Sequence, residues 1–147
     1  MTREEKIDVV YRHLVKNVVP RGRVTTYGEI GAATGIKSGM HGQPLASVLH
    51  HILRRCDERG LPPITSVVVR KGSECDGGRH GVVGQGYFVG EAKTPNKAGR
   101  FRSEEFKRVS TGGVYRPDPE APKPEFRSMV EAHQDSVWGH RDWPEHL

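Results

Sequence analysis

The chain has 147 residues, a net charge of +5 with histidine counted as neutral, and 34% hydrophobic residues. This length suits one domain with a hydrophobic core. No run of about 18 apolar residues exists, so we expect no membrane partner. The positive charge favours a polyanionic partner, above all nucleic acid.

Location and metal content follow from the first residues and from the cysteines. Residues 1–6 are charged and do not resemble an apolar leader. Cys56 and Cys75 form no CxxC pair and have no metal-ligand spacing. We therefore expect a cytoplasmic protein with reduced thiols, without a metal site and without a cofactor.

Helical periodicity predicts an amphipathic helix over residues 3–18. Thr2 and Glu5 have the spacing of a capping box at its start, and Gly22 follows its end. The β-branched residues 24–26 then predict a short strand.

The next two helices are predicted from their caps and their apolar spacing. Thr26 has capping-box spacing to Glu29, which predicts a helix from Tyr27 to Thr34, and residues 36–43 read as a glycine-rich turn. A longer helix is predicted from Pro44 to about Gly60. Its polar stripe consists of Gln43, Ser47, His50 and Arg54.

After these helices the pattern changes to strand. Residues 64–70 are rich in β-branched side chains, residues 72–86 are rich in glycine, and residues 86–89 suit a returning strand. Two helices followed by a β-hairpin predict an α+β fold: a winged-helix-like helix-turn-helix domain with residues 72–86 as the wing.

The remainder of the chain is predicted to be an extension of this domain. Residues 91–102 are polar and basic, and residues 103–108 suit a short helix. Residues 111–124 are interrupted by prolines and predict a linker. A last helix is predicted from Pro124 to Gly139. We therefore divide the chain into a DNA-binding domain over 1–90 and an extension over 91–147 that packs on it.

A family resemblance begins at Tyr11. Residues 11–31 read YRHLVKNVVPRGRVTTYGEIG, which resembles the start of the DNA-binding domain of O6-alkylguanine-DNA alkyltransferases and alkyltransferase-like proteins. The likeness weakens over residues 36–88 and is absent from residues 91–147. It implies that Tyr27 contacts a DNA phosphate and helps to rotate a nucleotide out of the duplex.

The chain departs from this family where alkyl transfer takes place. The family carries Pro-Cys-His-Arg before a strand, and here Ile64, Thr65 and Ser66 follow Pro63 instead. An alkyl acceptor must be a thiolate activated by a base, which isoleucine cannot supply. Cys56 lies on the apolar face of a predicted helix, and Cys75 lies in a loop without an assigned base. We therefore expect no alkyltransferase activity and no catalytic residue.

The resemblance also implies that the helix predicted from Pro44 to about Gly60 reads bases. One residue at its start differs from the family. Gln43 stands where the family has an arginine that fills the gap left by a flipped base, and it lacks the charge and planar fork of arginine. Groove binding by the stripe remains the expectation. The predicted DNA-binding residues are Tyr27, Gln43, Ser47, His50, Arg54, Arg23, Lys37, Arg70 and Lys71.

The sequence thus favours non-catalytic binding of double-stranded DNA, with modified or distorted DNA as a possible target. One alternative is a metal-dependent nuclease or nucleic-acid-processing enzyme that uses C-terminal histidines and carboxylates. The relevant residues are His133, Asp135, His140, Asp142 and His146. The other alternative is a protein-binding module on the same scaffold.

Overall fold

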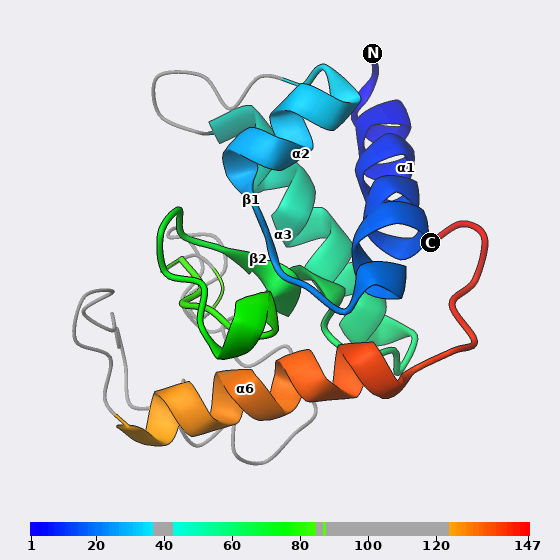
Figure 1. The fold of residues 1–147 in the computed structure, drawn as a ribbon. Coiled ribbons are helices and arrows are strands. Elements are labelled where there is room, and N and C mark those ends of the chain that lie inside the picture. The colour runs from blue at the N-terminus through cyan, green and yellow to red at the C-terminus, as the bar shows by residue number, and fades with distance from the viewer. Residues whose placement is uncertain (37–42, 85–86, 88–123) are drawn as a thin grey trace, which may run out of the picture.

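The computed structural model describes residues 1–36, 43–84, 87 and 124–147. Helices surround a small two-stranded sheet (Figure 1). This confirms the expected combination of helix and sheet. No helix within the described ranges has the length and apolarity needed to cross a bilayer.

The first helix, α1 (Arg3–His13), starts at the predicted capping box. Thr2 Oγ1 accepts a hydrogen bond from the amide of Glu5 at 3.1 Å, and the Glu5 carboxylate accepts one from the amide of Thr2 at 3.3 Å. The helical path continues as a π-helical turn, η1 (Leu14–Val18), and a 3-10 turn, η2 (Val19–Arg21). It stops at Gly22, whose φ of +64° suits glycine.

Strand β1 (Thr25–Thr26) leads into helix α2 (Tyr27–Thr34), and helix α3 (Gln43–Glu58) follows. Both helices lie close to their predicted bounds. The core forms where α1 packs against α2 and α3. It includes the fully buried side chains Ile7, Val10, Leu14, Ile30, Leu45 and Ile52.

The predicted strand over residues 64–70 is wrong for its first half. Ile64–Val67 form a 3-10 turn, η3, and only Val68–Val69 form a strand, β2. The turn is closed by a hydrogen bond of 2.9 Å from the amide of Ser66 to the carbonyl of Pro63. All residues of η3 and β2 are buried, so their β-branched composition reflects burial as much as strand structure.

The pairing of β2 also differs from the predicted hairpin. β2 pairs in parallel with β1, in the register Thr25 with Val68 and Thr26 with Val69. The returning strand predicted over residues 86–89 is wrong at Tyr87, which has helical backbone geometry. An isolated antiparallel bridge joins Val69 to Val83 instead. The loop between them contains a 3-10 turn, η4 (Asp76–Gly78).

The last helix, α6 (Pro124–Gly139), has the predicted bounds and packs against η3 and η2. The chain then runs back along α1 (Figure 1). Tyr11 Oη donates to the carbonyl of Pro144, and His146 Nδ1 lies 2.7 Å from a carboxylate oxygen of Asp8. Arg59 donates to the carbonyl of His146 at 2.7 Å. We call residues 140–147 the C-terminal strap.

Several expectations lie outside the described residues. They are most of the glycine-rich turn with Lys37, most of the returning strand, the basic segment 91–102, the short helix 103–108 and the linker up to residue 123.

Candidate nucleic-acid interface

Tyr27 is the first residue of α2 and is partly exposed. Its relative exposure is 38%, which sets it apart from the buried Tyr11 and Tyr87. Its hydroxyl lies 3.7 Å from the position that a Cβ would take on Gly84. Partial burial raises the pKa of the phenol, which therefore stays a hydrogen-bond donor at neutral pH. The structure thus places Tyr27 at a helix N-terminus beside the loop that returns from β2.

The first turn of α2 has an open end. The hydroxyl of Thr26 accepts from the amide of Glu29 at 3.3 Å, as its capping position predicts. The Glu29 carboxylate accepts from Thr25 Oγ1 at 3.0 Å instead of completing the box. Gly28 is exposed, and a Cβ there would meet no atom closer than 4.0 Å. An anion can therefore approach the amides of this turn closely.

Helix α3 presents its polar stripe away from the core. Ser47 is exposed, while His50 and Arg54 are half-buried. Arg54 makes no ion pair within the described part of the chain, unlike its neighbour Arg55, which binds Glu4 at 2.6 Å. Gln43 is the first residue of α3, and its side chain lies outside the description.

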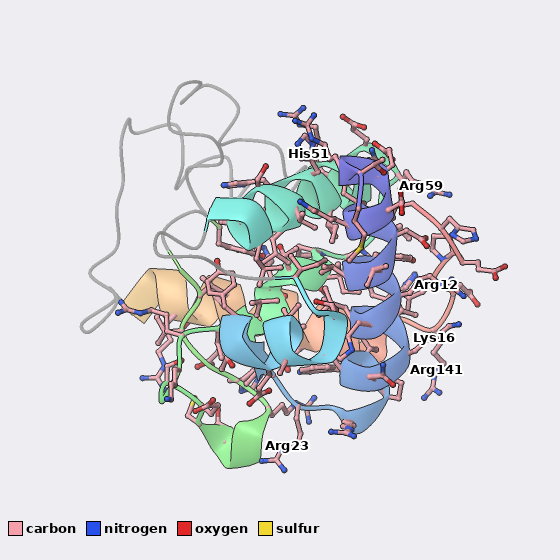
Figure 2. The ribbon with its side chains drawn as sticks, turned by 90° about the horizontal axis from the view of Figure 1, so that it is seen from above. Arg12, Lys16, Arg23, His51, Arg59 and Arg141 are labelled. Carbon is pink, nitrogen blue, oxygen red and sulfur yellow. The ribbon has the colours of Figure 1, made fainter. Side chains whose placement is uncertain are left out.

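The remaining predicted contacts are basic residues in turns. Arg70 and Lys71 are exposed immediately after β2. Arg23 is also exposed, and its guanidinium covers Gly78, where a Cβ would come within 2.8 Å of Nε. Arg23 therefore lies against η4, at a different edge of the molecule from the labelled His51 of α3 (Figure 2).

Comparison of the chain with protein-family models, curated proteins and solved structures found no match. The alkyltransferase resemblance of residues 11–31 therefore stays an expectation.

Residues 64–66, which the resemblance would align with the reactive motif of the alkyltransferases, are buried. Ile64 and Ser66 have no exposed surface, and Thr65 is 6% exposed. Beneath them lies Gln134 of α6, whose amide donates to the carbonyls of Ser66 at 2.8 Å and Gly81 at 3.1 Å. This polar contact was missed by sequence reasoning. Its signal was the spacing of Val130, Gln134 and Val137, which puts Gln134 on the apolar face of the helix.

A second buried contact lies next to it. Tyr87 Oη lies 2.7 Å from His133 Nδ1. Burial lowers the pKa of His133 to about 4 and raises that of Tyr87 well above its usual value. Both groups are therefore neutral at physiological pH, and the tautomer of His133 sets the direction of the hydrogen bond between them.

The two cysteines differ sharply in their surroundings. Burial raises the pKa of Cys56 to about 12, while Cys75 is half-buried in the loop before η4. We expect a thiol reagent to modify Cys75 and spare Cys56 in the native protein, and to modify both after denaturation. We also expect no methylated protein after incubation with O6-methylguanine DNA. Intact-mass spectrometry checks both results, and a methyl group on Cys56 would restore the alkyltransferase hypothesis.

The C-terminal histidines and carboxylates of the nuclease alternative are distributed over several contacts. His133 contacts Tyr87, His140 packs edge-on against Trp143 at 4.7 Å between ring centroids, and His146 binds Asp8. The structure does not gather these residues into one centre.

One group within the described residues has metal-ligand spacing. Asp76, His80 and Glu131 offer ligand atoms within 4.8 Å of one another. However, His80 Nδ1 lies 2.8 Å from Asp76, and His80 Nε2 lies 2.8 Å from Asp135. Both ring nitrogens are therefore already engaged, and the group links the η4 loop to α6.

Proposed function

We propose that the chain binds duplex DNA without catalysis, through the N-terminus of α2 and the outer face of α3. This is the mode that the resemblance to alkyltransferase-like proteins implies. The observation that carries the proposal is the partly exposed Tyr27 at the open first turn of α2. A phosphate at this position receives the phenol hydrogen bond, the amide of Gly28 and the favourable end of the helix dipole.

The proposal includes the winged-helix-like arrangement. α2 and α3 form the helix pair, and residues 70–84 form the wing. The bridge between Val69 and Val83 supports this, as does the hydrogen bond of 2.8 Å from the amide of Arg70 to the carbonyl of Val82. These contacts bring the loop back antiparallel to β2. Arg70 and Lys71 then lie at the start of the wing, where basic side chains can hold phosphates.

The test is fluorescence anisotropy of a labelled duplex at several salt concentrations. We expect the affinity to fall steeply with salt, because cations on the protein displace counterions from DNA. Tyr27→Ala and Arg54→Ala are each expected to weaken binding by roughly ten-fold. Tyr27→Phe removes only the hydroxyl, and so separates its contribution to the affinity from that of the ring.

Arg12→Ala is the matched control, because it removes an arginine from the outer side of α1, where Arg12 pairs with Asp8 at 3.8 Å (Figure 2). It is expected to leave duplex affinity within about two-fold of the wild type. No binding at low salt, for undamaged and alkylated duplexes alike, would contradict the proposal and favour a protein-binding module.

A further inference from the structure

A groove lies between η1–η2 and the C-terminal end of α6, and the sequence predicted no ligand for it. Its apolar lining comes from Val15, Val19, Trp138 and Trp143, and its volume is about 540 Å³. Small-ligand sites commonly fall between about 300 and 1,000 Å³. Both tryptophans are half-buried and pack against the core on one side. The groove therefore combines a firm aromatic lining with access from solvent.

The tryptophans are held in place by neighbouring groups. Trp138 Nε1 donates to the carbonyl of Arg79 at 3.2 Å. The ring of His140 meets Trp143 edge-on, with 4.7 Å between centroids. The strap bond from Tyr11 to Pro144 fixes the backbone next to Trp143. These contacts reduce the entropy that the rings would lose on binding a planar ligand.

The charged lining of the groove is entirely basic. Arg21 and Arg141 line it, both are exposed, and neither makes an ion pair within the described residues. No aspartate or glutamate is among the described residues that line it. Figure 2 shows Arg12, Lys16 and Arg141 directed outward on the same side of the molecule. Lys16 on η1 thus adds positive charge beyond the groove, while Arg12 is paired with Asp8.

Indole rings next to unpaired guanidinium groups fit one kind of ligand well. A nucleobase stacks on an aromatic ring, and the adjoining phosphates bind arginine, which offers a planar fork of donors. We propose that this groove binds a nucleotide unit of single-stranded nucleic acid. The groove shares no residue with the proposed duplex interface. The two proposals can therefore be tested separately.

The experiment uses the tryptophans as the probe. Trp138 and Trp143 are the only tryptophans of the chain, so its indole fluorescence reports directly on this groove. We expect titration with a short oligothymidylate at low salt to quench the fluorescence saturably. Arg21→Ala and Arg141→Ala are each expected to raise the Kd by roughly three-fold to ten-fold and to reduce its salt dependence. Circular dichroism checks that each variant is folded.

The controls separate this site from charge alone and from duplex binding. Arg54→Ala and Arg70→Ala are expected to leave the quenching unchanged while duplex affinity falls. If duplex binding fails and quenching persists, the duplex proposal is wrong and this one stands. Four results would overturn it: no quenching, equal quenching by inorganic polyphosphate, equal affinity for free thymidine monophosphate, or full affinity in both groove variants.

Discussion

Gln134→Met is expected to lower the free energy of unfolding by about 1–3 kcal/mol, and Gln134→Ala by more. The Gln134 side chain is fully buried and donates to the carbonyls of Ser66 and Gly81. Methionine has a similar shape but removes the amide that donates to the buried carbonyl of Ser66 and the part-buried carbonyl of Gly81, and losing the partner of a buried group costs about 1–3 kcal/mol. Alanine adds a cavity under η3. Urea denaturation followed by circular dichroism measures the change.

Ser136→Ala is the matched control on the same helix. Its hydroxyl is exposed and bonds only to the carbonyl of His133 at 2.6 Å among the described residues. We expect its removal to change stability by less than about 0.5 kcal/mol. Equal stability of Gln134→Met and the wild type would show that the two hydrogen bonds contribute nothing net.

His133 is expected to make the protein sensitive to mild acid. Its pKa is about 4 in the folded chain because of burial, against 6.5 when unfolded. A depressed pKa means that its contribution is present above pH 6.5 and is lost as the pH falls toward 4. The full loss is on the order of 3 kcal/mol. The free energy of unfolding of the wild type, measured by urea titration, should fall as the pH is lowered from 6.5 to 4.

His133→Asn removes this sensitivity while keeping an amide that can either donate to or accept from Tyr87. The difference in slope between wild type and variant isolates His133 from the other groups that titrate. Parallel stability curves over this range would contradict the prediction.

His80→Asn provides a contrast of opposite sign. Burial opposes protonation of His80, but its hydrogen bonds to Asp76 and Asp135 outweigh this and raise its pKa above 6.5. Its contribution is therefore present below pH 6.5 and is lost as the pH rises through the folded pKa. In the His80→Asn variant, the free energy of unfolding is expected to change less with pH above 6.5. Its fall below pH 6.5 is expected to remain as steep as in the wild type.

Local signals in the sequence predicted most helices of the fold. The capping box at Thr2, the cap at Thr26 and Pro124 at the start of α6 each act within one turn, so their spacing is visible in the chain. The sheet was predicted less well. Which strand pairs with β2 depends on contacts between residues far apart in sequence, and the parallel partner β1 lies some forty positions earlier.

The candidate sites show the same division. Tyr27 was found because its motif is continuous along the chain. The pair of His80 with Asp135 and the groove between Val19 and Trp143 join segments far apart in sequence. No spacing rule connects such residues, although the aromatic and basic types that line the groove were visible separately. Only the fold brings them together.

The C-terminal strap has a consequence for how the chain folds. The bonds from Tyr11 to Pro144 and from His146 to Asp8 join residues separated by 133 and 138 positions. Such contacts close the longest loop in the molecule, and their loop-closure entropy has to be overcome before they add stability. During synthesis α1 precedes the strap by more than a hundred residues, so its outer side stays uncovered until residues 140–147 are available. The packing of α1 is therefore completed only when the strap docks.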